Sequence, residues 1–255
     1  MTKDEIIRLE NRWAELLKGP NRLNETKVSN TKITAAELQE QLSQDEEYQK
    51  WLKEKEQVRT ALEEAYAKDE KPLVEDLKKA GLNITSSWDL VNTKSSYKSV
   101  IPILLEHLSK PYHLKNKEGI VRALAVKEAI GKASPVLIAE YNRTPKDKTL
   151  LRWAIGNTIY TTITEDDVES ILPIVLDKTN GTSRQMFVAA LGKVKSEKAE
   201  DVLVNLLDDE EVTPHALEAL GRMKSRKARE KITMLTNHPK ALIRKEALKT
   251  LRKLS

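Results

Sequence analysis

Apolar residues recur every three or four positions along most of the chain, which is the spacing of one face of an α-helix. In the segment 165–176, for example, Ile171, Ile174 and Val175 follow this spacing. In the second half of the chain such segments come in pairs that are joined by short polar turns. The pattern predicts first helices over residues 97–108, 134–141, 165–176, 196–207 and 225–235, and second helices over residues 117–126, 147–160, 182–194, 212–223 and 240–254.

The second half also contains an internal sequence repeat. Residues 190–199 recur as residues 219–228, with seven of ten positions identical. The repeat carries one apolar position through all five pairs, at Leu124, Ile155, Leu191, Leu220 and Leu251. Seven residues before these positions stand Lys117, Lys148, Arg184, Thr213 and Arg244. Because one short helix pair cannot bury its apolar face alone, successive pairs must stack on one another.

The third pair carries the clearest family features. It combines Pro173 in the first helix, Asp177 in the turn, Arg184, and the sequence Ala-Leu-Gly at residues 190–192. In these features the pairs resemble short bacterial HEAT-like repeats, over about residues 97–255. The resemblance implies an all-α, right-handed superhelix, a HEAT-like solenoid of about five helix pairs with an N-terminal helical extension. The fourth pair departs from the pattern, because Thr213 replaces the arginine that would contact the turn.

The first ninety residues are predicted to be helical without the repeat. Capping-box patterns at Thr34 and Ser43 each predict the start of a helix. Gly81 is a typical residue to end one. We therefore predict helices over residues 6–17, from 34 to about 43, over 45–68 and over 70–80.

The two kinds of pattern divide the chain. We expect residues 1–92 to form an N-terminal helical cap and linker, and residues 93–255 to form the solenoid. An exposed apolar helix face is unusual for a monomer, so we expect the N-terminal part to pack on the first repeat.

Composition excludes several classes of protein. The chain has no Cys, so it has no disulfide, no Cys-bound metal site and no thiol nucleophile. It lacks a run of about 18 apolar residues, so a membrane span is not expected. Its start is charged and carries no secretory signal. We therefore expect a cytoplasmic protein that does not associate with membranes.

The net charge of +5 is distributed unevenly. Residues 196–220 carry a net charge of −7, and residues 221–255 carry +10. A basic segment of this kind is typical of a surface for nucleic acid or for an acidic partner. It is equally typical of the solvated outer face of a terminal repeat, and both interpretations stay open.

Motifs for catalysis or cofactors are not found. Gly131 and Lys132 resemble the centre of a phosphate-binding loop, but Val126 and Ala133 stand where a glycine and a hydroxyl are needed. The four histidines are never three or four residues apart, which excludes the helical zinc motif and the iron-binding hydroxylases built of HEAT-like repeats. We expect no cofactor, no metal and no enzymatic activity.

A DNA glycosylase is the sharpest enzymatic alternative. One glycosylase family is built of HEAT-like repeats, and it resembles this chain in size and basic character. Its members hold a damaged nucleotide with aromatic side chains and an Asp, and no such set can be aligned here. Trp153 beside Arg152 mimics part of it, but we expect Trp153 to lie in the core between the second and third pairs.

Second helices line the concave face of a solenoid, where extended partners dock. Candidate partner-binding residues on this face are Glu118, Arg122, Arg152, Asn157, Gln185, Lys193, Arg222, Lys249 and Lys253. A second candidate group, in loops, consists of Trp88, Asp89, Asn92, Tyr112 and His113. Because the first group is mostly basic, it favours an acidic segment of a protein partner.

Other interpretations of these residues stay open. Nucleic acid could bind along the same basic stripe, and ordinary solvated helix surface would also account for it. The loop group could pack the linker against the first repeat instead of contacting a partner. We predict a monomeric, non-enzymatic protein-binding module or scaffold.

Overall fold

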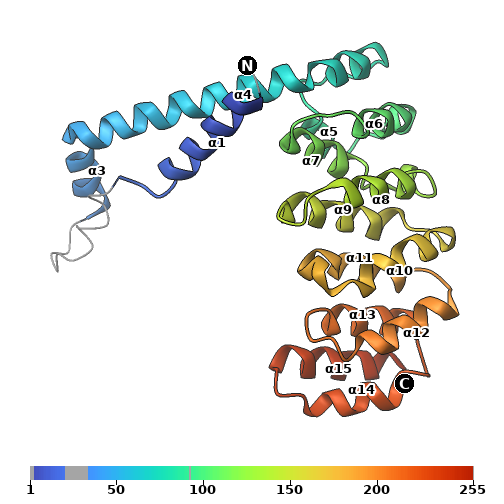
Figure 1. Ribbon diagram of the computed structural model, residues 1–255. Coiled ribbons are helices and arrows are strands. Elements are labelled where there is room, and N and C mark those ends of the chain that lie inside the picture. The colour runs from blue at the N-terminus through green and yellow to red at the C-terminus, as the bar shows by residue number, and fades with distance from the viewer. Residues whose placement is uncertain (1–2, 21–33, 92, 255) are drawn as a thin grey trace. The chain divides into compact units, whose positions relative to one another are not determined.

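The computed structural model describes residues 3–20, 34–91 and 93–254, and every regular element in these ranges is a helix (Figure 1). The chain divides into two compact units, residues 1–71 and 72–255. Each unit has its own hydrophobic core. The division falls inside the long helix α4.

The N-terminal unit is a small helical assembly. Its core contains Ile6 and Leu16 from the first helix and Val58, Leu62 and Ala65 from the long one. The Trp51 indole N–H donates to the Leu16 carbonyl over 3.2 Å. The helices are α1 (Lys3–Leu16), α3 (Ala35–Gln44) and the first part of α4 (Glu46–Lys79).

The predicted starts of α3 and α4 are confirmed in one case and wrong in the other. Thr34 forms a capping box with Glu37, with N···O distances of 2.8 and 3.2 Å. Ser43, in contrast, lies in the last turn of α3, where its hydroxyl donates to the Glu40 carbonyl over 2.6 Å. The cap of α4 is the carboxylate of Asp45, which accepts from the backbone N–H of Tyr48 at 2.9 Å.

Helix α4 is one continuous helix of 34 residues, where the sequence predicted two. Pro72 lies inside it and did not break it. Downstream of Pro72, Leu73 and Leu77 are fully buried in the core of the second unit, which stabilises this last part. The helix ends at Lys79, and Gly81, the glycine predicted to end a helix here, follows it with a backbone φ of +94°.

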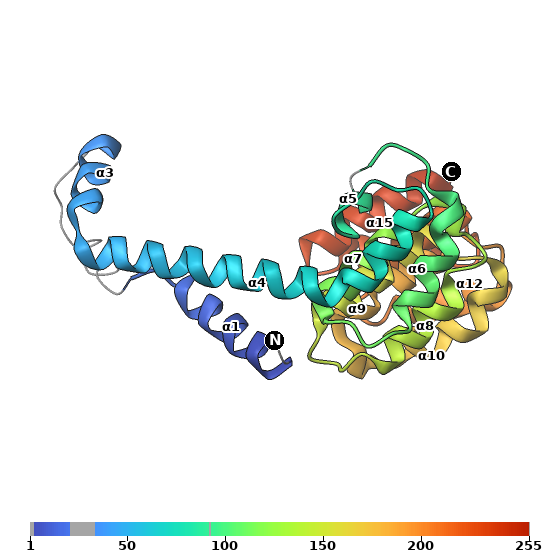
Figure 2. The ribbon, with the colours of Figure 1, turned by 90° about the horizontal axis from the view of Figure 1, so that it is seen from above.

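The second unit contains all five predicted helix pairs and is an all-α solenoid (Figures 1 and 2). The pairs are α6 (Ile101–Leu108) with α7 (Leu114–Ala123), α8 (Ser134–Arg143) with α9 (Thr149–Thr162), α10 (Val168–Leu176) with α11 (Gln185–Leu191), α12 (Glu197–Leu206) with α13 (Thr213–Met223), and α14 (Arg229–Met234) with α15 (Ala241–Leu254). Short 3₁₀ turns cover Lys98–Val100, Lys127–Ala129, Glu165–Asp167, Lys178–Arg184 and Leu235–Asn237.

First and second helices form two separate layers of the solenoid (Figures 1 and 2). Neighbouring second helices pack much more closely on one another than neighbouring first helices do. Because partners of helix-pair stacks dock on the concave side, which second helices line, we call the outer face of this closely packed layer the concave face. Residues of α7, α9, α11, α13 and α15 that point away from the core consequently line the concave face.

Glycines permit this close approach. A Cβ atom on Gly192, after α11, would lie 2.4 Å from the Cα of Ala219 in α13. A Cβ on Gly156 in α9 would lie 3.1 Å from the Cβ of Met186 in α11. The sequence repeat places glycine at this position so that one backbone can touch the next helix.

The core of the solenoid begins before the first repeat. Leu73, Leu77, Ile84 and Leu90 are all buried in it. Residues 72–91, which the sequence pattern grouped with the N-terminal extension, therefore lie in the same compact unit as the repeats.

Candidate interaction surface

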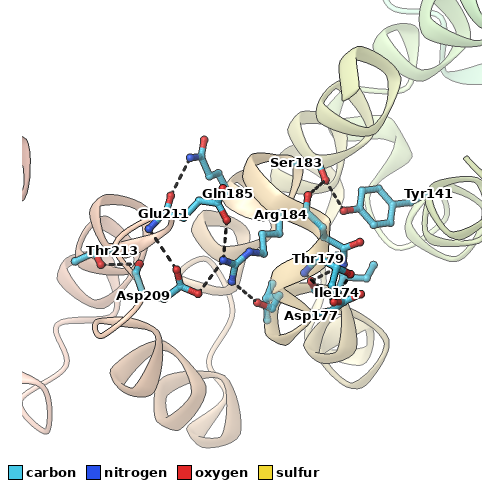
Figure 3. Close-up of polar contacts among 12 residues, drawn as sticks. Tyr141, Ile174, Asp177, Thr179, Ser183, Arg184, Gln185, Asp209, Glu211 and Thr213 are labelled. Carbon is cyan, nitrogen blue, oxygen red and sulfur yellow. Dashed lines mark hydrogen bonds and ion pairs between the residues drawn. The ribbon is translucent and has the colours of Figure 1, made fainter. Parts of the chain in front are cut away.

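The turns within the helix pairs are joined by buried polar contacts, and Arg184 makes one that links the third pair to the fourth (Figure 3). Its side chain is only 1% exposed. The guanidinium donates to the carbonyl of Val175, at the end of α10, over 3.1 Å. It also donates to Asp209 (2.8 Å) and Glu211 (3.0 Å) in the turn of the fourth pair. Gln185, a predicted partner-binding residue, donates to the Glu211 carbonyl over 2.9 Å and so joins this contact.

Arg152 plays the same part in the second pair, so its predicted place on the concave surface is wrong. It is 3% exposed and donates to the carbonyls of Tyr141 (3.0 Å) and Thr144 (2.8 Å). Its other terminal nitrogen donates to the Asn180 side chain, in the next turn, over 2.6 Å. Lys148, which the repeat spacing placed in this role, is exposed.

Thr213 replaces the arginine in the fourth pair and has a shorter reach. Its hydroxyl donates to the carbonyls of Leu207 (3.2 Å) and Asp209 (2.7 Å), which closes the end of α12. The connection to the fifth pair is made by Glu210, 2.6 Å from the ammonium group of Lys240. Neighbouring turns are therefore still linked where the family pattern fails.

In the predicted loop group, Asp89 stabilises the turn before α5 (Trp88–Val91). Its carboxylate accepts from the backbone N–H (2.8 Å) and hydroxyl (3.0 Å) of Thr85 and from the N–H of Ser86 (3.1 Å). The hydrogen bond from the Thr85 backbone is the main cause that lowers the pKa of Asp89. Asn92 lies outside the described residues.

Tyr112 and His113 stabilise the start of α7. The Tyr112 hydroxyl is 2.6 Å from Nδ1 of His107, a buried side chain whose Nε2 lies 3.1 Å from Asp76 in α4. His113 is the N-cap, and its Nδ1 accepts from the backbone N–H of Lys115 over 3.2 Å. These contacts tie the end of α4 and the linker to the first repeat.

Trp88 joins the two predicted groups. It packs on α7 where Gly119 has no side chain, since a Cβ there would lie 2.8 Å from the indole nitrogen. Lys115 lies 4.1 Å and Arg122 6.0 Å from the centre of its ring. Arg122 also forms an ion pair with Glu118 at 2.8 Å. The structure thus brings Trp88, Glu118 and Arg122 together.

Trp153 is exposed on the concave face, so the prediction that it lies in the core is wrong. The side chain is 42% exposed, and Leu150, one turn earlier in α9, is 72% exposed. The buried place belongs to its neighbour Arg152. Asn157 and Tyr160 follow Trp153 by four and seven residues, so all three share one face of α9.

Tyr160 contacts one cationic side chain from each of the next two repeats, Lys193 and Arg222. We call these three residues the Tyr160 cluster. Lys193 donates to the Tyr160 carbonyl (2.5 Å), and its ammonium group lies 4.7 Å from the centre of the ring. Arg222 donates to the Tyr160 hydroxyl (2.7 Å) and lies 3.4 Å from Glu218. The exposed Lys193 side chain is partly desolvated beside Tyr160, and this desolvation, together with the charge of Arg222, lowers its pKa.

A groove of about 650 Å³ adjoins the cluster. It lies between the end of α11, the start of α12 and the end of α13. Lys193, Lys195 and Arg222 contribute cations to its walls, and Glu197 and Glu200 contribute carboxylates.

Residues 168–252, from the start of α10 into the last turn of α15, match the family described as HEAT repeats. The solenoid is built of HEAT-like repeats. No curated protein matches the chain in sequence. In this HEAT-like solenoid the Arg184 contact and two members of the Tyr160 cluster lie inside the matched segment, whereas Trp153 and Tyr160 precede it.

The last HEAT-like repeats carry charges of both signs on the concave face. Lys249 lies 3.1 Å from Glu246 in α15, and Lys253 is exposed. His215 in α13 has a buried Nδ1 without a hydrogen-bond partner among the described residues. Burial lowers its pKa, against the opposing charges of Glu218 and Glu246.

The described parts of the chain contain no group of three His, Cys, Asp or Glu side chains that could hold a metal ion. Among the same residues, every helix is too short or too polar to cross a membrane.

Proposed function

We propose that the solenoid is a cytoplasmic, non-catalytic protein-interaction module that binds an extended segment of a partner protein along its concave face. The observation that supports this most directly is the exposure of Trp153 beside Leu150 on a rigid helix. Trp, Tyr and Arg are the residues most often found at the energetic centres of protein interfaces. The same face of the stack presents all three.

The charges of this face favour an acidic segment in the partner. Lys193, Arg222 and Lys253 are exposed there. A partner with carboxylates at matching positions would associate faster and in one register. The rigid stack offers this surface preformed, which lowers the entropy that binding costs.

Nucleic-acid binding is the second candidate, because residues 221–255 carry a net charge of +10. Binding of this kind weakens steeply with added salt, since each phosphate contact releases counterions. Gel-shift titrations with DNA and RNA at about 50 mM salt separate the candidates. A shift that disappears at higher salt would favour nucleic acid, and the protein-partner proposal predicts no shift.

The main test is affinity capture with a matched pair of full-length variants. The concave variant combines Trp153→Ala, Lys249→Ala and Lys253→Ala. The control changes Leu176 and Lys198, which are exposed on first helices, and Lys227, which is exposed in the turn before α14, with Leu176→Ala, Lys198→Ala and Lys227→Ala. We expect a partner that the wild type and the control retain and the concave variant loses. Equal capture by both variants would contradict the proposal.

A further inference from the structure

Two different kinds of contact lie on one face of α9. Its N-terminal half exposes the apolar side chains of Leu150 and Trp153, and its C-terminal half ends at the Tyr160 cluster. Trp153 and Tyr160 are seven residues apart, which corresponds to about 10 Å along the helix axis. A single extended ligand can therefore touch both.

At the cationic end of this surface, Lys193 and Arg222 have hydrogen-bond donors that can still bind a carboxylate. No carboxylate pairs with Lys193 among the residues that the structure describes, where its ammonium group contacts only the carbonyl and ring of Tyr160. The two hydrogen bonds of Arg222, to Tyr160 and Glu218, both use one terminal nitrogen. The rest of the guanidinium fork points to no protein acceptor in the described ranges and can donate to a carboxylate.

We propose that this surface recognises a peptide segment with a carboxylate side chain and a large apolar side chain about three residues apart. The Asp or Glu accepts hydrogen bonds from Lys193 and Arg222, and the apolar side chain packs on Trp153. The spacing follows from about 3.3 Å per residue in an extended chain, so that three residues span the distance between the two sites. This inference rests on the proposed function and names the chemistry of the partner.

The surroundings of the cluster favour one carboxylate over a chain of phosphates. Glu218 lies 3.4 Å from Arg222, and Glu197 and Glu200 line the adjoining groove. A DNA duplex carries one negative charge per ~1.7 Å of axis and would bring further phosphates against these carboxylates. A peptide side chain delivers a single charge, and its apolar neighbour contacts Leu150 and Trp153.

The test begins with an unbiased selection. A random library of displayed peptides of about 12 residues, long enough when extended to span this face, is selected on the immobilised full-length protein. We expect the enriched peptides to share an Asp or Glu about three residues from Leu, Phe or Trp, in either order. Enriched peptides without a carboxylate, or no enrichment at all, would overturn the inference.

A fluorescein-labelled synthetic peptide of the enriched sequence then measures the two contacts separately by fluorescence polarisation. Lys193→Ala and Arg222→Gln should each weaken binding by about ten-fold, as should Glu→Gln or Asp→Asn in the peptide. A protein variant and the peptide change remove the same ion pair. Combining one protein variant with the peptide change should therefore add little to the loss of affinity that either causes alone. Trp153→Ala should also weaken peptide binding by about ten-fold. Its effect should be smaller on a peptide whose apolar residue has been replaced by Ala.

The controls separate this inference from the proposed function. Lys198→Ala and Leu176→Ala, on first helices, should bind the peptide within about two-fold of the wild type. If enriched peptides lose binding only in Lys249→Ala and Lys253→Ala, the concave face binds protein but the Tyr160 cluster is not the site. A labelled single-stranded RNA that binds and is lost in Lys193→Ala would overturn the inference in favour of phosphate.

Discussion

Buried arginines connect the repeats at the level of single residues. Arg184 and Arg152 are 1% and 3% exposed, and each donates to a carbonyl of its own pair and to a side chain in the next turn. A buried charge is tolerated only when hydrogen bonds and counter-charges replace the lost water. These two side chains therefore hold neighbouring turns in register.

Removing Arg184 should destabilise the solenoid strongly. Arg184→Met leaves Asp209 and the Val175 carbonyl without their donor, and we expect a loss of about 3 kcal/mol in the free energy of unfolding. Urea denaturation measures it. Arg143→Met is the matched control, since Arg143 is 52% exposed and pairs with Glu140. It should cost less than about 1 kcal/mol, and equal losses would contradict the role of Arg184.

His215 should make stability depend on pH. Burial lowers its pKa in the folded protein, so the unfolded chain, with a His pKa of about 6.5, takes up a proton first as the pH falls. Stability should therefore decrease as the pH drops through about 6.5 towards the lowered pKa of the folded state. In urea titrations at several pH values, His215→Gln should show a smaller decrease over this range. Parallel profiles for wild type and variant would contradict the assignment.

The sequence predicted single residues wrongly for two reasons: the rotational phase of a helix, and contacts between residues far apart in the chain. Adjacent helix positions differ by about 100°, so a small error in the phase of α9 exchanged the buried Arg152 with the exposed Trp153. Lys193 and Arg222 were among the residues predicted on this face, but no pattern in the sequence pointed to Tyr160 or to its contacts with them. Tyr160 is 33 residues from Lys193 and 62 from Arg222, and only the stacking of three repeats brings them together.

At the scale of elements, the second helices determine the curvature of the stack. Their close packing depends on the glycine position of the repeat, as at Gly192 and Gly156. The sequence predicted all five pairs because their apolar spacing and their repeat agree. It did not predict the continuity of α4, because Asp69 and Glu70, followed by Pro72, are typical of a helix boundary.

Adding one methyl group at Gly192 should test the close packing of α11 on α13. In Gly192→Ala the Cβ would lie 2.4 Å from the backbone of Ala219, and we expect a loss of about 1–3 kcal/mol in unfolding free energy from overpacking. Gly221→Ala is the comparison, since its Cβ would meet only side-chain atoms of Thr250 and Lys253, at 3.1 Å or more. Its loss should be smaller, and a larger one would contradict the packing argument.

Truncation should show where the solenoid begins. A fragment of residues 72–255 keeps Leu73 and Leu77 of α4 in the core, together with Leu90. A fragment of residues 93–255 loses them, at about 1.5–3 kcal/mol for each buried leucine. Thermal unfolding followed by circular dichroism should therefore give a clearly lower midpoint for the shorter fragment. Equal midpoints would place the boundary at residue 93.

At the scale of the whole molecule, the chain combines an N-terminal helical unit with a HEAT-like solenoid. The family match covers the last three pairs, and the features that distinguish the concave face centre on α9, in the second pair. General repeat chemistry therefore accounts for the stack, and Trp153 with the Tyr160 cluster accounts for its proposed specificity. Sequence patterns predict the stack, because its features recur in every pair. They do not predict the residues of the proposed specificity, because these occur only once.

Site-specific photo-crosslinking in cells tests the central claim, partner binding on the concave face, most directly. A photoreactive phenylalanine at Asn157 lies between Trp153 and the Tyr160 cluster on α9, and the same group at Lys198 probes an exposed position of α12. Mass spectrometry identifies what each position captures. We predict a protein crosslinked from position 157 and not from position 198. Crosslinks of equal yield at both positions, or only nucleic acid at position 157, would contradict the account.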